Sequence, residues 1–152
     1  MTAHNKSNNN SLIKIGLDVR TTFMIRNIPN KYTQEMLIAE LNETHKGKYD
    51  FLYLRIDFAN KCNVGYAFIN FVEISTVLSF AELHVGRKWT CFNSNKICEL
   101  SYANVQGYPA LVDKFRTSST MRERPEYRPK VFFTSGPMKG MEAPFPYYSG
   151  QK

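Results

Sequence analysis

Cysteine is scarce in this chain of 152 residues, which has only Cys62, Cys91 and Cys98, with no CxxC spacing among them. An odd number of cysteines without paired spacing argues against both a disulfide framework and a zinc site. We therefore expect a reducing, intracellular location, nuclear or cytoplasmic or both. The sequence also has no apolar run of bilayer-spanning length and no signal-like apolar segment, so we expect neither membrane insertion nor secretion.

Motifs of common catalytic chemistry are missing as well. The sequence contains no nucleophile elbow, no phosphate-binding loop and no paired His/Glu motif. His45 and His84 have no partners at the spacing that metal ligands require. We therefore expect a protein that is not an enzyme and that uses no metal or other cofactor.

Positive charge is unevenly distributed along the chain, whose net charge is +7. Residues 21–103 contain nine cations and eight anions, whereas residues 104–152 contain eight cations and four anions. A nearly neutral central region cannot be a strong non-specific binder of polyanions. Any binding of nucleic acid there must rest on base stacking and on a few cations at specific positions. The tails would add salt-dependent attraction.

Residues 64–71 form a strand-like stretch with two different faces. Because side chains alternate along a strand, Tyr66, Phe68 and Asn70 lie on one face while the apolar residues between them point into a core. Neighbouring exposed rings are unfavourable in water unless something flat lies on them. Stacking of a base on an aromatic ring is worth ~1–3 kcal/mol. This stretch predicts a surface for single-stranded RNA.

Two further stretches predict strands beside this one. In residues 23–28 the alternate apolar residues supply a core side and leave Met24 and Arg26 facing outward. Residues 50–57 alternate in the same way, and the loop after them contains a lysine within reach of a phosphate. The residues that we predict to contact RNA are Tyr66, Phe68, Met24, Arg26, Tyr53, Arg55, Lys61 and Asn70.

The apolar spacing between these strands predicts two helices. One begins after Thr33 as N-cap and runs to about Lys46, before Gly47. The second covers about 75–84, with apolar residues at the spacing of one buried face, and a last strand covers 96–102. The order predicts an α+β, ferredoxin-like split βαβ sandwich: a four-stranded antiparallel sheet with two helices on one face.

The segments around this domain, which we place at residues 20–104, differ from it in composition. Residues 1–19 are polar and aperiodic, which predicts disorder. Residues 105–118 predict an extra C-terminal helix with proline in its first turn, which either packs beside the sheet or lies across it and covers the RNA face. Residues 119–152 predict a mostly irregular, basic and aromatic tail that is able to order on binding.

Two signatures in these strands are similar to those of a known domain. Residues 65–71 resemble the long signature of the RNA recognition motif, a glycine followed by alternating aromatic residues, with Val64 in place of the usual cation. Residues 23–28 resemble its short signature, with Met24 at the position where most members have a third stacking ring. The resemblance implies the same fold and RNA binding on the sheet.

Longer stretches resemble a narrower family. Residues 22–32, 49–58 and 60–68 are similar to the C-terminal RNA recognition motif of the Mei-two-like meiosis regulators of yeasts and plants. The resemblance covers about residues 20 to 118, including the extra helix. It implies RNA binding in the service of meiotic commitment, a step of cell cycle regulation, in a protein with other RNA-binding domains outside this chain.

Less specific interpretations of the same residues stay open. The outward position of Tyr66 and Phe68 is also explained if the C-terminal helix packs over these rings. Arg26 and Arg55 are also explained if they are solvated or paired with a cross-strand acid such as Glu99.

The rival function is protein binding. Some RNA recognition motifs of splicing factors hold a peptide tryptophan on their helical face, and Arg87-Lys88-Trp89 together with an acidic first helix is similar to that arrangement. Exposed rings on the sheet are what such modules need least, and Trp89 itself is better explained as core. We therefore expect single-stranded RNA as the ligand of a monomer. Protein partners would bind through the helical face or the tails.

Overall fold

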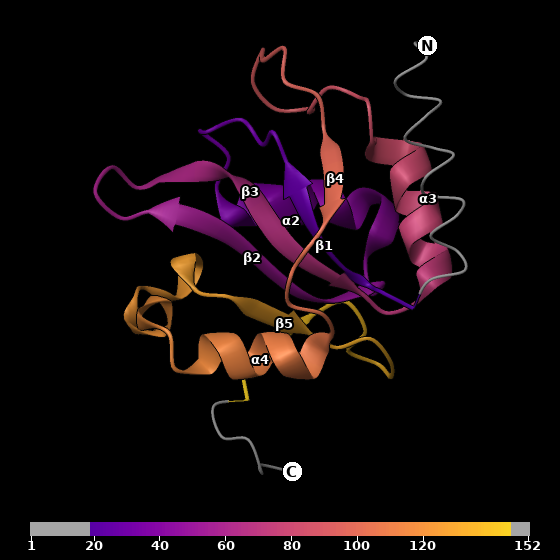
Figure 1. Cartoon of the computed structure of the whole chain (residues 1–152), viewed down its shortest axis with the longest axis vertical. Helices are drawn as coiled ribbons and strands as arrows, with labels where there is room; N and C mark the ends of the chain where they lie inside the picture. Colours follow the sequence, from indigo (N-terminus) through magenta and orange to yellow (C-terminus); the bar gives the residue numbers. More distant parts are fainter. Residues whose placement is uncertain (1–18, 147–152) are drawn as a thin grey trace.

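The computed structural model describes residues 19–146 and shows a single sheet with helices packed on both of its faces (Figure 1). The segment predicted to be disordered, residues 1–19, lies outside the described residues except for Val19. No helix of the described part is long and apolar enough to span a membrane.

The elements, in chain order, are β1 (Thr22–Arg26), α2 (Gln34–His45), β2 (Tyr49–Asp57), β3 (Cys62–Phe71), α3 (Ile74–His84), β4 (Glu99–Tyr102), α4 (Tyr108–Arg116), the 3-10 helices η1 (Ser119–Arg122) and η2 (Pro125–Tyr127), β5 (Lys130–Phe132) and β6 (Glu142–Ala143).

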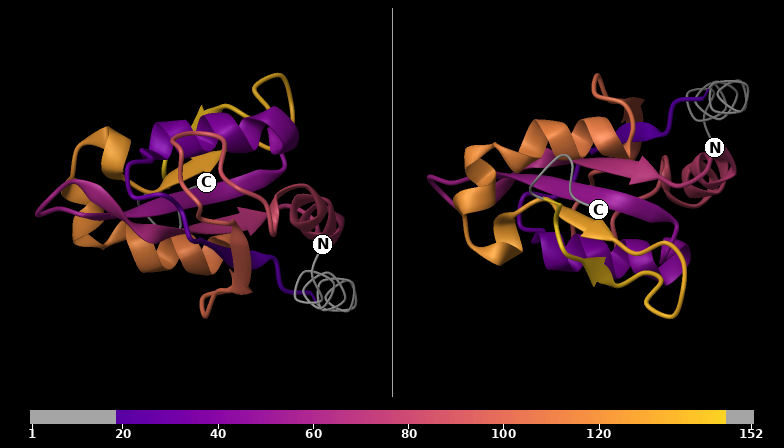
Figure 2. Two further views of the ribbon diagram at one scale, coloured as in Figure 1. Left: turned by 90° about the horizontal axis from the view of Figure 1, so that it is seen from above. Right: turned by 90° about the horizontal axis from the view of Figure 1, so that it is seen from below.

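The six strands are antiparallel and lie in the order β4-β1-β3-β2-β5-β6. Strands β1 to β4, which are adjacent in this order, and the helices α2 and α3 form the ferredoxin-like arrangement that the sequence predicts. Figure 2 shows α2 and α4 on opposite faces of the sheet. The sheet therefore has a helical face, covered by α2 and α3, and an opposite face, over which α4 passes.

The bounds of α2 follow from its capping residues. Thr33 is the N-cap, and its Oγ1 accepts a hydrogen bond of 3.1 Å from the backbone N–H of Met36. The helix ends at His45, and Gly47 follows with φ of +78°, a conformation that favours glycine. The prediction of a helix from Thr33 to about Lys46 is confirmed to within a residue.

The main core lies between the sheet and its helical face. In β3, Ala67 and Ile69 have no exposed surface, and they pack with Leu37 of α2 and Phe80 of α3. Tyr66 and Phe68, on the other side of the same strand, are only half-buried. The two faces that the sequence predicts for this strand are therefore confirmed at these four positions.

The tail departs from the prediction of a mostly irregular segment. Strand β5 pairs with the edge of β2, with Val131 opposite Phe51, and Phe132 enters the main core 5.0 Å from the ring of Tyr49. A buried glutamine, Gln34, connects the two segments. Its Nε2 donates to the carbonyl of Arg128, and its Oε1 accepts from the N–H of Leu54, each at 2.8 Å. Residues 119–146 are thus part of the folded domain.

A hydrogen-bonded histidine cluster lies between the C-terminal ends of α2 and α3. Thr44 Oγ1 is 2.7 Å from His45 Nδ1 and 2.8 Å from His84 Nε2, while His45 Nε2 is 3.0 Å from Ser79 Oγ. The pKa of His45 is lowered to about 4, mainly by burial and to a smaller extent by the neighbouring His84 and Lys48. Burial also lowers the pKa of His84. Both rings are therefore neutral at pH 7.

The low pKa of His45 predicts a loss of stability in acid. Between about pH 6.5 and about pH 4 the unfolded chain binds a proton at His45 that the native protein does not bind, so the free energy of unfolding falls as the pH falls. We expect a decrease of about 1–3 kcal/mol across this window. Urea unfolding of wild type and His45→Gln over the window measures it, because the variant lacks the titrating group. A difference between the two proteins that does not change with pH would contradict the prediction.

Candidate nucleic-acid interface

Strand register places the predicted contact residues in rows across the face opposite α2. Met24 of β1 lies opposite Phe68 of β3, which lies opposite Tyr53 of β2. In the next row, Arg26 lies opposite Tyr66. These side chains come from three strands that are separated in sequence, and the sheet brings them together.

Helix α4 covers part of this face. Phe115 is at the centre of the contact, with its ring centroid 5.7 Å from Phe51, 5.2 Å from Tyr53 and 5.7 Å from Phe68. Leu111 of the same helix is fully buried. Of the two placements considered for this helix, the structure therefore has the one across the sheet. Tyr53 is only 2% exposed beneath it, so the prediction of Tyr53 as an accessible stacking ring needs correction.

Tyr66 and Phe68 form the part of the face that α4 leaves partly open. Their ring centroids are 5.8 Å apart and the rings are perpendicular, and both side chains are half-buried. Arg55 Nη1 donates a hydrogen bond of 3.3 Å to the hydroxyl of Tyr66. Two partly exposed aromatic rings thus lie beside a cation, which is the composition of a surface that stacks bases.

Two exposed arginines, Arg26 and Arg55, lie beside these rings. Glu99 of β4 is the cross-strand neighbour of Arg26. Even so, the ion pairs within 4.0 Å in the described part of the chain do not join Arg26 or Arg55 to Glu99. Pairing with Glu99 therefore does not account for these cations, and both guanidinium groups can meet a phosphate.

Asn70 has a structural role that the sequence did not reveal. It is 4% exposed, its Oδ1 accepts hydrogen bonds from the hydroxyls of Thr21 and Thr22, and its Nδ2 donates to Asp50 at 2.9 Å. The Oγ1 of Thr22 also accepts from the N–H of Gly107, just before α4. Asn70 thus helps to hold the start of α4 on β1, and its prediction as a residue open to RNA needs correction.

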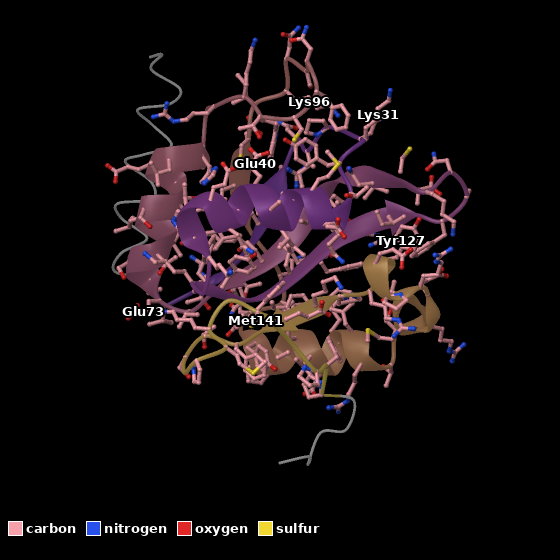
Figure 3. All side chains as sticks on the ribbon, turned by 180° about the vertical axis from the view of Figure 1, so that it is seen from behind. Lys31, Glu40, Glu73, Lys96, Tyr127 and Met141 are labelled. Carbon is pink, nitrogen blue, oxygen red and sulfur yellow. The ribbon has the colours of Figure 1, made fainter. Side chains whose placement is uncertain are left out.

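Lys61 lies in the turn between β2 and β3, apart from the exposed rings. It has φ of +62°, and its ammonium group is 5.2 Å from the ring centroid of Phe58 and 5.3 Å from that of Tyr127. Figure 3 labels Tyr127 near the end of this hairpin. A cation held by two rings still exposes much of its surface, so the predicted phosphate contact at Lys61 stays a prediction.

The helical face uses several of the groups that a peptide site would need. Trp89 is 6% exposed and packs 5.5 Å from the ring of Tyr32, so its assignment to the core is confirmed. Glu40 of α2, labelled in Figure 3, accepts hydrogen bonds from the hydroxyls of Tyr32 and Thr90. This carboxylate is therefore already satisfied within the domain. Clusters of three or more His, Cys, Asp or Glu side chains able to hold a metal do not occur in the described residues.

Sequence reasoning missed a cleft between the sheet and the segment after α4. It has a volume of about 400 Å³, and Phe68, Phe115 and Thr120 are among the residues that line it. The hydroxyl-rich run at residues 117–120 was the available signal, but its position depends on α4 crossing the sheet.

The comparisons with known proteins agree with this fold. Residues 20–116 match the family described as RNA recognition motif 2, which makes the chain an RNA-binding module of the RNA recognition motif class. It is 59% identical over 134 residues to the meiosis protein mei2 of Schizosaccharomyces pombe, and 53% identical over 134 residues to protein MEI2-like 2 of rice, Oryza sativa subsp. japonica. The chain belongs to the Mei2-like family of RNA recognition motif proteins.

These matches cover most of this chain but only a small part of each relative. Each alignment covers 88% of this chain but only 18% of mei2 and 16% of MEI2-like 2, so the chain spans less than a fifth of the length of these relatives. Among solved structures, the RNA recognition motif of Rna15 with bound RNA (GU) is similar with a TM-score of 0.48 and 17% identity, over 61% of this chain and 93% of that chain.

Proposed function

We propose that this domain binds single-stranded RNA on the part of the sheet that α4 leaves open, with bases stacked on Tyr66 and Phe68. The observation that supports this most directly is the pair of half-exposed rings beside Arg26 and Arg55, which have no carboxylate partner among the described residues. The rings supply stacking and the arginines supply contacts to phosphates. The half-buried thioether of Met24 takes the place of a third ring.

We further propose that this RNA binding serves meiosis, in the nucleus or the cytoplasm, with the domain acting as a monomer. The support is the similarity to a relative named as a meiosis protein. Because the chain spans less than a fifth of these relatives, the proposal does not extend to their other functions.

A second candidate function is peptide binding on the helical face. It is favoured by a cavity of about 220 Å³ beside Trp89, lined also by Glu43, His84 and Arg87. The indole N–H of Trp89 is buried and has no hydrogen-bond acceptor among the described residues. A peptide seated there would contact α2 and α3 and leave Tyr66 free, which separates the two candidates.

The substitution Tyr66→Ala tests the first proposal. Removal of this ring should lower the affinity for a short single-stranded RNA by about 1–3 kcal/mol, because a stacking contact is lost. The free energy of unfolding should change much less, since the side chain is only half-buried. Fluorescence anisotropy with a labelled RNA measures the affinity, and urea unfolding measures the stability.

Phe92→Ala is the matched control for loss of a ring. Phe92 is 48% exposed and packs against Tyr32, on the side of the sheet away from Tyr66. Its substitution should leave RNA affinity unchanged. Equal affinity of folded Tyr66→Ala and wild type would show that RNA, if bound, lies elsewhere.

A further inference from the structure

The cleft beside α4 is continuous with the exposed rings of the sheet. Its sheet side includes Tyr53, Arg55 and Phe68, and its other side includes Phe115 at the end of α4 and Thr120 in η1. Its volume of about 400 Å³ lies within the range of about 300–1,000 Å³ that is typical of small-ligand sites. Because Phe68 belongs both to the cleft and to the open face, a chain lying on the face can extend into the cleft.

The charged groups that line the cleft have one sign. They are Arg55 of β2 and Lys114 of α4, and no carboxylate is among the lining residues within 19–146. The ion pairs within 4.0 Å in the described part of the chain involve neither of these two cations. The Lys114 ammonium lies 5.7 Å from the ring centroid of Phe115, at the wall of the cleft. A cleft with two unpaired cations and no acid is suited to a phosphate group.

Hydroxyl groups at the start of η1 line the side of the cleft opposite the strands, and hydrogen bonds hold them in place. Ser118 is the N-cap of η1, and its Oγ accepts hydrogen bonds from the N–H and the hydroxyl of Thr120, at 3.2 and 3.0 Å. Thr120 also interacts with Tyr53, whose pKa is raised mainly by burial. The hydroxyl of Thr120 is thus held at the wall of the cleft, where it can exchange hydrogen bonds with the edge of a base.

We propose that this cleft binds one nucleotide of the single-stranded RNA, so that α4 and η1 are part of the RNA site. The base lies against Phe68 and meets the hydroxyl of Thr120, and the phosphate meets Arg55 and Lys114. This inference rests on the RNA binding proposed above. It adds one nucleotide position that is contacted by residues from outside the four strands of the basic fold.

The test compares the binding of short single-stranded RNAs to wild type, Thr120→Val and Lys114→Gln by fluorescence anisotropy. Thr120→Val should lower affinity about 3- to 10-fold, the effect of one lost hydrogen bond. An abasic nucleotide placed at each RNA position in turn should remove that difference at one position only. Lys114→Gln should lower the slope of log K against log salt by about 0.7, the value for one phosphate contact in a single strand.

Three variants serve as controls. Thr120→Ser keeps the hydroxyl and should bind as wild type does. Thr117→Val removes an exposed hydroxyl at the end of α4, and Lys96→Gln removes an exposed cation at the opposite end of the molecule (Figure 3). Both should leave the affinity unchanged, and Lys96→Gln should also leave the salt slope unchanged.

The outcomes separate this inference from the function on which it rests. If Tyr66→Ala weakens RNA binding while Thr120→Val and Lys114→Gln bind as wild type, the cleft holds no nucleotide and the sheet proposal stands. Tighter binding by Lys114→Gln would mean that α4 only covers the sheet, which also overturns the cleft. If folded wild type binds none of the RNAs, the proposed function itself is wrong.

Discussion

Replacing Phe115 with alanine should destabilise the protein by about 3–5 kcal/mol, the typical loss for a buried phenylalanine. This ring is 6% exposed and is in contact with three aromatic side chains of the sheet, Phe51, Tyr53 and Phe68. Its removal leaves a cavity at the centre of the contact between α4 and β2. Urea unfolding monitored by circular dichroism gives the free energy of unfolding.

Lys114→Ala is the control on the same helix, since Lys114 is the exposed neighbour of Phe115 and makes no ion pair among the described residues. Its effect on stability should stay within about 0.5 kcal/mol. If Phe115→Ala is as stable as Lys114→Ala, then α4 does not pack on the sheet in solution. The cleft beside it would then not exist either.

Removal of residues 119–152 should have an effect of similar or larger size. It deletes the buried side chains of Val131 and Phe132, which are worth about 1.5–3 kcal/mol each. It also leaves the buried amide of Gln34 without its acceptors in the tail, a further penalty of about 1–3 kcal/mol. Because small domains have only about 5–15 kcal/mol of stability, we expect the shortened protein to be marginally folded.

Two further proteins make this result interpretable. Removal of residues 147–152 alone is the control for shortening the chain. Phe132→Ala, in the full chain, isolates the packing of one ring against Tyr49 and should cost about 3–5 kcal/mol. A protein ending at residue 118 that unfolds at the same urea concentration as the full chain would show that β5 does not stabilise the domain.

Local patterns predicted the basic fold well, because they directly reflect backbone geometry. The alternation along β3 separates Tyr66 from Ile69, and the structure places them on opposite faces. The extra C-terminal helix was predicted within residues 105–118 and is observed at Tyr108–Arg116, because Pro109 suits a first turn and the apolar residues recur at helical spacing.

The environment of the outward-facing residues could not be predicted in the same way, because it depends on contacts that are distant in sequence. Tyr53 is outward on its strand, yet it is buried by a helix that follows about 60 residues later. Asn70 is polar and outward, yet it is used in hydrogen bonds to Thr21, Thr22 and Asp50.

The short strand β5 was missed for a related reason. It is only three residues long and follows Pro129, so its local pattern is weak. Its pairing with β2 and the hydrogen bonds from Gln34 decide its conformation.

The most direct test of the central claim is an NMR titration of the ¹⁵N-labelled chain with a panel of short single-stranded RNAs. Binding on the open face predicts that the amide shifts of β1 and β3 change most, at Met24, Arg26, Tyr66 and Phe68, with further changes at Thr120 if the cleft is occupied. The amides of α2 and α3 should change little, because α2 lies across the sheet from α4 (Figure 2) and α3 packs in the same core as α2. Shift changes confined to α2, α3 and the surroundings of Trp89 would contradict RNA binding on the sheet.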